Sequence, residues 1–209
     1  MMTRLRQICC EPRMLYENYK GESTKFTMCL ELIETLKENG KKVLLFSSFT
    51  SIFDSFIEEF NQRGIKYHMI TGAVDKKKRK EEVDAFQSDD SDVFLISLKA
   101  GGTGLNLTKA QAVIHYDPWW NVSAQNQATD RAYRIGQTKN VLVYQLLMKN
   151  TIEAKIYEMQ KRKKEMSDIF VENSNGGIST LSKEELRDLF SMESVSYTHL
   201  RAHETGAYL

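Results

Sequence analysis

The fold is decided by the stretch Phe94–Gln137, which reads FLISLKAGGTGLNLTKAQAVIHYDPWWNVSAQNQATDRAYRIGQ. It opens on an apolar run that leads into a glycine-rich turn, SLKAGGTGLNL at 97–107. A second apolar run at 112–116 ends in DPWWN at 117–121, and the polar run QATDRAYRIGQ follows at 127–137. Short apolar runs without alternation are typical of strands buried on both faces of a parallel sheet.

The same pattern extends to both sides of this stretch. Apolar runs predict five strands, at 43–46, 66–70, 93–96, 112–116 and 141–147. Helical periodicity predicts helices between them: one capped by Ser23 and closed by Gly40, one over 52–60 that ends near Gly64, and one capped by Asp75. Strands that alternate with helices of this length predict an α/β fold, a parallel β-sheet flanked by helices.

The chain changes character after Asn150. The segment 151–170 has the periodicity of a long helix, 173–177 is a glycine- and asparagine-rich break, and 182–185 is a capping box that opens a last short helix. The terminal 194–209 has neither helical nor strand periodicity, and its composition differs from everything before it. We expect this tail to be unstructured and non-native.

Composition sets outer limits on the class of protein. The 209 residues carry 29 Lys and Arg against 28 Asp and Glu, a net charge of +1, so any nucleic-acid contact must come from local patches. Three cysteines without a C-x-x-C pair fit neither a disulfide framework nor a zinc site and favour a reducing compartment. No apolar run reaches the roughly 18 residues that span a bilayer, so we expect an intracellular protein without a membrane partner.

The glycine-rich run can bind a phosphate. Glycines at 101, 102 and 104 let backbone N–H groups approach an oxyanion, and the Thr103 hydroxyl can donate to the same group. Glycine turns between a strand and a helix are also common for purely structural reasons. This run alone leaves both interpretations open.

The polar run is more specific. On a helix, Gln127, Arg131 and Arg134 fall at i, i+4 and i+7, on one face. Two adjacent guanidinium groups repel each other unless an anion lies between them. Asp130 could pair with Arg134, but it cannot satisfy both arginines, and a phosphoanion matches the guanidinium geometry better.

Other polar and aromatic residues have simpler interpretations. His68 and His115 fall in or beside strands and are expected in the core or in hydrogen bonds, so we expect no metal. The lysine-rich run 76–80 is expected to be a solvated helix face. Phenylalanines recurring over 46–60 are expected to pack the core.

Three motifs in order, SLKAGGTGLNL, DPWWN and QATDRAYRIGQ, resemble the second RecA-like lobe of a Swi/Snf-type DNA-dependent ATPase of helicase superfamily two. The resemblance covers roughly 4–170. Two positions depart from the family pattern: Val122 replaces a proline, and Gln125 stands near an acidic position. We expect a lead-in from a preceding lobe at 1–22, a RecA-like lobe at 23–150 and a helical extension at 151–190, followed by the unstructured, non-native tail at 191–209 that the composition indicates.

In that family ATP binds between two lobes, and the resemblance therefore assigns roles to residues here. It implies catalytic arginine fingers at Arg131 and Arg134. It implies an ATP cleft lined by Gln127, Gly102, Gly104 and Asp130. DNA contacts are implied for Ser47, Ser48, Thr71, Lys99, Gly101 and Thr103, and coupling of nucleotide to DNA for Trp119, Trp120 and Asn121. The expected partners are double-stranded DNA and the first RecA-like lobe, which would hold ATP and magnesium.

The sequence contains no G-x-x-x-x-G-K-[ST] P-loop, so we expect a C-terminal fragment of a longer protein, inactive as an ATPase on its own. A non-catalytic DNA- or partner-binding module of the same fold stays open. A metabolic α/β enzyme is less favoured because it leaves the Gln127, Arg131 and Arg134 face unexplained. The expected location is the bacterial cytoplasm, at the nucleoid, or the nucleus of a eukaryote.

Overall fold

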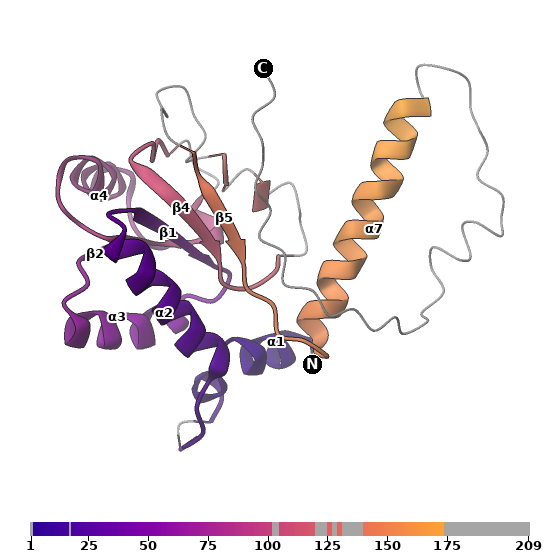
Figure 1. Cartoon of the computed structure of the whole chain (residues 1–209), viewed down its shortest axis with the longest axis horizontal. Coiled ribbons are helices and arrows are strands. Elements are labelled where there is room, and N and C mark those ends of the chain that lie inside the picture. Colours follow the sequence, from indigo (N-terminus) through magenta and orange to yellow (C-terminus); the bar gives the residue numbers. More distant parts are fainter. Residues whose placement is uncertain are drawn as a thin grey trace.

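The computed structural model of the chain describes residues 2–16, 18–101, 105–119, 125–126, 129–130 and 140–173 (Figure 1). Strands and helices alternate along most of it. The elements are α1 (Met2–Cys10), the 3-10 helix η1 (Pro12–Met14), α2 (Thr24–Glu38), β1 (Lys42–Ser47), α3 (Ile52–Arg63), β2 (Tyr67–Ile70), α4 (Lys76–Ser88), β3 (Val93–Ser97), α5 (Leu98–Gly101), β4 (Ala110–His115), β5 (Leu142–Gln145) and α7 (Ile152–Asn173).

The five strands form one sheet in the order β2-β3-β1-β4-β5, and every neighbouring pair is parallel. The two strands at its centre are almost wholly buried: all of β3 and all of β1 after Lys42. Helices cover both faces of the sheet, so the side chains on both sides of these strands are buried. As expected from the sequence, this burial explains why apolar residues do not alternate with polar ones along them. The predicted α/β fold with a RecA-like parallel sheet is confirmed.

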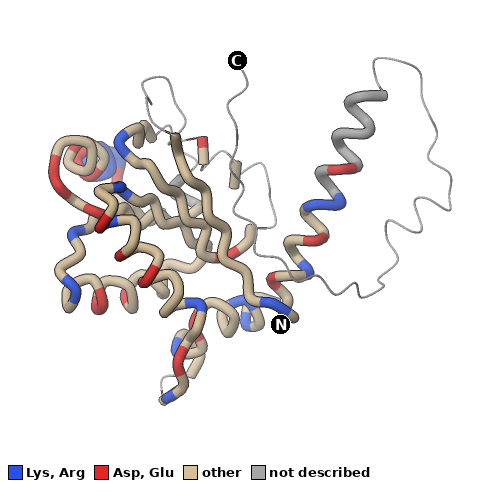
Figure 2. The backbone as a smooth tube through the Cα atoms, in the orientation of Figure 1, with Lys and Arg blue, Asp and Glu red and all other residues tan. Residues whose placement is uncertain are grey.

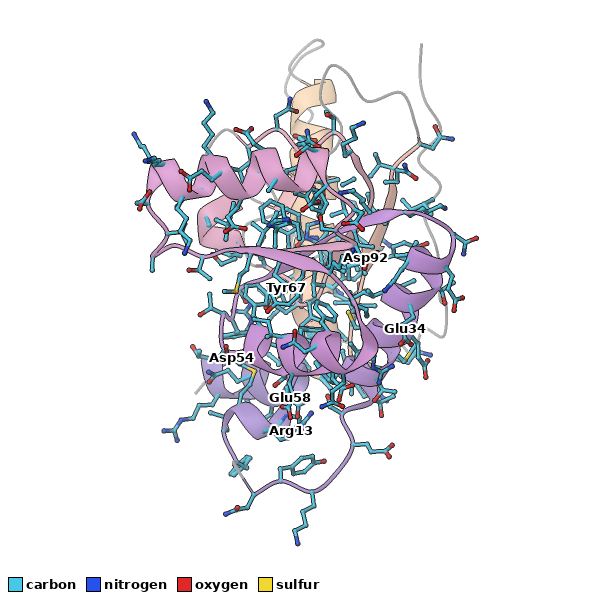
Figure 3. The ribbon with its side chains drawn as sticks, turned by 90° about the vertical axis from the view of Figure 1, so that its left-hand side faces the viewer. Arg13, Glu34, Asp54, Glu58, Tyr67 and Asp92 are labelled. Atoms are coloured by element: carbon cyan, nitrogen blue, oxygen red, sulfur yellow. The ribbon has the colours of Figure 1, made fainter. Side chains whose placement is uncertain are left out.

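Successive side chains along a strand pack alternately into two hydrophobic clusters, one on each face of the sheet. Val43 and Leu45 of β1 lie in the cluster that includes the apolar faces of α2 and α3. Leu44 and Phe46 point the other way, into the cluster that includes Phe86 of α4. Figure 3 shows the three layers edge-on, with Asp54 and Glu58 marking α3 below the sheet and α4 above it. The predicted phenylalanine core is confirmed, although Phe46 belongs to a different cluster from Phe53, Phe56 and Phe60.

Helix ends follow the local sequence signals. Gly64 closes α3 in the left-handed conformation, with φ of 61°, which glycine adopts without a steric penalty. The Asp75 carboxylate accepts from the Lys78 N–H and caps α4. Ser23 takes the N-cap position of α2 without a side-chain hydrogen bond.

The largest local difference from the sequence prediction follows β3. A glycine-rich turn was expected to leave this strand directly, but Leu98–Gly101 forms the short helix α5. Its Leu98 and Ala100 side chains are buried in the same cluster as Phe86, which explains why the backbone is helical as far as Gly101. The predicted phosphate-facing glycines at 102 and 104, with Thr103, lie outside the described residues.

The N-terminal segment docks on the sheet and on the start of α7. The Tyr116 hydroxyl, just beyond β4, donates to the Cys10 carbonyl over 2.6 Å. Lys25 and Glu153 form a buried ion pair, with 2.6 Å between Nζ and Oε1. From this anchored base α7 extends away from the sheet (Figure 1), and Figure 2 shows charges of both signs alternating along it. Within the described ranges, every helix is too short or too polar to cross a membrane.

Candidate functional site at the carboxyl edge of the sheet

Four strands end side by side at one edge of the sheet. The register pairs Ser47 with Ser97, Phe46 with His115, and His115 with Gln145. Two of the three motifs leave the sheet at this edge: SLKAGGTGLNL at the end of β3, and DPWWN just after β4. Ligands of open parallel sheets bind at this edge, beyond the carboxyl ends of the strands.

Asp117 is the polar centre of this edge. Its side chain is fully buried, and both carboxylate oxygens are used. Oδ1 accepts from the Ser47 hydroxyl at 2.8 Å and from the Ser48 N–H at 2.9 Å. Oδ2 accepts from the Ser48 hydroxyl and from Arg6 Nη2. The carboxylate thereby fastens the loop after β1 to the segment after β4.

Arg6 reaches this centre from α1. Its Nη2 lies 2.9 Å from Asp117 Oδ2, 2.9 Å from the Ser48 hydroxyl and 3.0 Å from the Pro118 carbonyl, and its guanidinium stacks 5.0 Å from the centroid of the Phe49 ring. One cation therefore joins three segments that are distant in sequence. Sequence reasoning missed this residue, because no local pattern around Arg6 indicates a partner in the segment after β4.

The structure brings together two of the predicted DNA contacts. Ser47 and Ser48 both bind Asp117, while Thr71 follows β2, whose last residue Ile70 aligns with Ile96 at the same edge. The Ser47 hydroxyl is buried and donates inward, so its burial counts against a direct DNA contact by this side chain. Ser48 and Thr71 are partly exposed. DNA binding by each of the three stays a prediction.

The remaining predicted DNA contacts are less defined. Gly101 is the last residue of α5. The Lys99 side chain and the whole of Thr103 lie outside the described residues.

Trp119 is the described member of the predicted coupling group. Its partly buried side chain packs against the cluster that contains Phe86, and its backbone N–H donates to Gln125 Oε1 over 3.4 Å. Trp120 and Asn121 lie outside the described residues. This hydrogen bond links Trp119 to Gln125, the residue that departs from the acidic position of the family pattern.

The segment 125–137 carries Arg131 and Arg134 and is called the arginine-bearing segment; the structure describes 125–126 and 129–130 of it. Asp130 is exposed, and its N–H donates to the Asn126 carbonyl over 2.8 Å, the i to i−4 bond of an α-helix. The Thr129 hydroxyl lies 2.8 Å from His115 Nε2 at the end of β4. Gln127, Arg131 and Arg134 lie outside the described residues, so their predicted roles are not tested by this geometry.

Both described histidines are hydrogen-bonded. His115 is buried, and burial lowers its pKa to about 4, so the ring is neutral near pH 7. His68 lies between Glu82 and Asp89, each 2.7 Å away. In the described part of the chain, no three His, Cys, Asp or Glu side chains gather closely enough to hold a metal ion. All three cysteines are free thiols.

A five-stranded parallel sheet with helices on both faces, and with its polar residues gathered at the carboxyl edge, defines a RecA-like lobe. The model of the helicase conserved C-terminal domain matches residues 24–136, so the chain belongs to that family. It is a C-terminal lobe of the Swi/Snf type within helicase superfamily two.

Three relatives illustrate this membership. The chain is 41% identical over 195 residues to an uncharacterized ATP-dependent helicase of Mycoplasma pneumoniae, covering 91% of this chain and 18% of that protein. It is 40% identical over 158 residues to the chromatin-remodeling ATPase INO80 of Candida albicans, covering 75% of this chain and 11% of that protein. The solved C-terminal part of the Fun30 ATPase domain superposes with a TM-score of 0.63 at 34% identity, covering 75% of this chain and 53% of that one. The chain thus spans about a fifth or less of these two curated relatives.

Proposed function

We propose that the chain is the C-terminal motor lobe of an ATP-dependent double-stranded-DNA translocase or remodeller. ATP and magnesium would be held by a first RecA-like lobe, and this lobe would complete the cleft. The family membership supports the proposal, as do relatives whose names identify ATP-dependent helicases and a chromatin-remodeling ATPase. By the proposal, the 1–22 lead-in comes from the first lobe, and 151–190 is an extension of the motor.

The proposal assigns catalysis to two arginines. Arg131 and Arg134 would reach the γ-phosphate of ATP, with Gln127, Asp130, Gly102 and Gly104 lining the cleft. Phosphoryl transfer depends on positioning and charge stabilisation, and an arginine finger contributes about 10³- to 10⁵-fold in rate. Mounting the finger on a separate lobe makes hydrolysis depend on closure of the cleft.

The observation that carries the proposal is the Asp117 network. A fully buried carboxylate with partners from the ends of β1 and β4 and from α1 fixes the point where the chain leaves the sheet toward the arginines. A catalytic group acts efficiently only when its support is rigid. Arg131 lies 14 positions after this anchor in the sequence.

DNA binding would use the same edge. Ser48 and Thr71 are the partly exposed described candidates, with Ser47, Lys99, Gly101 and Thr103 completing the proposed set. Trp119, Trp120 and Asn121 would couple nucleotide state to DNA grip. Closure of the cleft would move the DNA contacts of one lobe relative to the other, which yields translocation.

The test is steady-state ATP hydrolysis by the two-lobe protein, with and without linear duplex DNA. Arg131→Ala and Arg134→Ala should each lower the DNA-stimulated kcat by about 10³-fold or more, with DNA affinity nearly unchanged. Arg63→Ala is the matched control, because Arg63 ends α3 at the amino edge of the sheet, where it pairs with Glu34 and Glu59. Wild-type turnover by Arg134→Ala would show that the lobe is a binding module and not part of the catalytic machinery.

A further inference from the structure

Within the described residues, a side-chain hydrogen bond links His115 of β4 to the start of the arginine-bearing segment, with 2.8 Å between His115 Nε2 and the Thr129 hydroxyl. The ring is 1% exposed and stacks on Phe46, with centroids 5.6 Å apart and planes at 23°. Phe46 and Gln145 flank it in the register of the neighbouring strands. The imidazole is therefore held in place by the sheet, and not by the segment it contacts.

The hydrogen-bond network favours one direction for this contact. The Thr129 hydroxyl has one proton, which it donates to the Gln125 carbonyl over 3.3 Å. With its proton in that bond, the hydroxyl oxygen accepts from His115, and the matching tautomer of the neutral ring carries its proton on Nε2. The other ring nitrogen, Nδ1, has no hydrogen-bond partner among the described residues, which costs less for a lone pair than for an unsatisfied N–H.

The contact belongs to a closed chain of interactions. His115 donates to Thr129, Thr129 donates to Gln125, and the Gln125 side chain accepts from the N–H of Trp119, four residues beyond His115. Thr129 precedes Arg131 by two residues and Arg134 by five. Thr129 is thus the described residue, hydrogen-bonded to β4, that lies closest in sequence to both arginines.

We propose that His115 is a positioning residue, whose neutral imidazole holds Thr129 and thereby sets the approach of Arg131 and Arg134 to the nucleotide. This inference rests on the proposed function of the arginines. His115 touches no reacting atom. It acts through Thr129, and its effect should appear in the chemical step and not in ATP binding.

Two pairs of variants separate this role from a merely structural one. Thr129→Val removes the hydroxyl at nearly constant shape, whereas Thr129→Ser keeps it. His115→Gln keeps an N–H donor near the position of Nε2, whereas His115→Asn places it near Nδ1 and loses the contact. The two variants of each pair are similar in size, but only one of them can form the hydrogen bond between positions 115 and 129. A thermal unfolding curve for all four verifies that they are folded at the assay temperature.

The kinetic test is DNA-stimulated ATP hydrolysis by the two-lobe protein. Thr129→Val and His115→Asn should lower kcat by about 10- to 100-fold, the cost of a misplacement of about 1 Å, with KM for ATP unchanged. Thr129→Ser and His115→Gln should restore most of the rate. In the present chain, nitrogen-15 NMR of the ring should show the Nε2–H tautomer, altered by Thr129→Val.

The outcomes are distinguishable. Wild-type kcat in Thr129→Val and His115→Asn, together with loss of activity in Arg134→Ala, would overturn the positioning role and leave the proposed function intact. Equal loss of rate in all four variants would assign His115 and Thr129 a purely structural role. If Arg134→Ala keeps its activity, the proposed function fails and the positioning role fails with it. An Nδ1–H tautomer would contradict the direction of the hydrogen bond.

Discussion

Arg6 Nη2 lies 2.9 Å from Asp117 Oδ2, although 111 residues separate the two in sequence. The Asp117 side chain is fully buried and that of Arg6 is 12% exposed, so the pair is shielded from solvent. The same nitrogen contacts Ser48 and Pro118, and the ion pair therefore joins α1 to two strand ends.

Breaking this pair should be costly. Arg6→Met should lower the free energy of unfolding by about 3 kcal/mol, because it leaves a buried carboxylate without its cation. Urea unfolding measures the change. Arg4→Met, an exposed position on the same helix, is the control and should stay within about 0.5 kcal/mol of the wild type. In a double-mutant cycle with Asp117→Asn, simple additivity of the two changes would contradict direct coupling.

The Lys25 and Glu153 pair should hold the base of α7 on the lobe. Lys25 Nζ lies 2.6 and 2.8 Å from the two carboxylate oxygens, and Glu153 also accepts from the Met148 N–H. Glu153→Ala should destabilise the protein by about 3 to 5 kcal/mol, since it leaves a buried ammonium unpaired. Hydrogen exchange should show that amides at the start of α7 lose protection. Pairing Glu153→Leu with Lys25→Met should recover most of the stability.

The matched control lies on the same helix. Lys161 and Glu165 form an i, i+4 pair at 4.0 Å with both side chains more than half exposed. Glu165→Ala should change stability by no more than about 0.5 kcal/mol, as is usual for a solvated pair. Equal effects of Glu153→Ala and Glu165→Ala would refute the anchoring role of the buried pair.

His68 should make stability depend on pH. Burial opposes its protonation, but hydrogen bonds to Asp89 and Glu82 outweigh burial and raise the His68 pKa above the ordinary 6.5. Burial raises the Asp89 pKa, but hydrogen bonds from Ser91 and His68 outweigh it and lower the pKa below its ordinary value. Lys42 Nζ lies 3.4 Å from the same carboxylate. The His68 contribution is therefore complete below 6.5 and is lost as pH rises through the raised value. The Asp89 contribution is present above its ordinary 3.8 and is lost on strong acidification.

The comparison that isolates this effect is wild type against His68→Gln. The difference in unfolding free energy should be larger at pH 5.5 than at pH 9, because the protonated ring pairs with two carboxylates only at the lower pH. Taking the difference cancels the contribution of His115, which is present in both proteins. Burial lowers the His115 pKa, so this residue destabilises the fold as pH falls below 6.5. A difference that does not change between the two pH values would contradict the ion pairs.

The exposed lysines at the start of α4 oppose the helix dipole. Lys76, Lys77 and Lys78 form its first turn, where the unpaired N–H groups favour negative charge. Lys76→Glu should therefore raise the unfolding free energy by about 0.3 to 1 kcal/mol at low salt, and less at high salt. Lys80→Glu, one turn further along, is the control and should gain less. Destabilisation by Lys76→Glu would show that this lysine makes a stabilising contact, and would contradict the interpretation of 76–80 as a solvated helix face.

Local features of the fold could be predicted from the sequence. Buried strands such as Val93–Ser97, the end of α3 at Gly64 and the cap at Asp75 each depend on residues within a few positions of one another. The helical turn at Leu98–Gly101 was missed because the glycines indicate a turn, whereas burial of Leu98 and Ala100 against α4 decides the backbone. Burial against a distant element has no local signature.

The polar contacts of the site were harder to predict. Arg6 with Asp117 and Lys25 with Glu153 span 111 and 128 residues, and nothing in either local sequence indicates the partner. An aspartate directly after a buried strand could have indicated a polar centre at the sheet edge, but not that its partner comes from α1. The arginine roles came from family resemblance, and among the predicted cleft residues only Asp130 lies in the described part of the chain.

In the proposed function, Arg131 and Arg134 act on a nucleotide held by another lobe. The most direct measurement is a structure of the two-lobe protein with duplex DNA, ADP and aluminium fluoride, which mimics the transferring phosphoryl group. Both guanidinium groups should then lie about 2.8 Å from the fluoride or phosphate oxygens, with the paired geometry of charge-assisted bonds. A closed cleft in which both arginines instead pair with carboxylates of their own lobe would contradict the account.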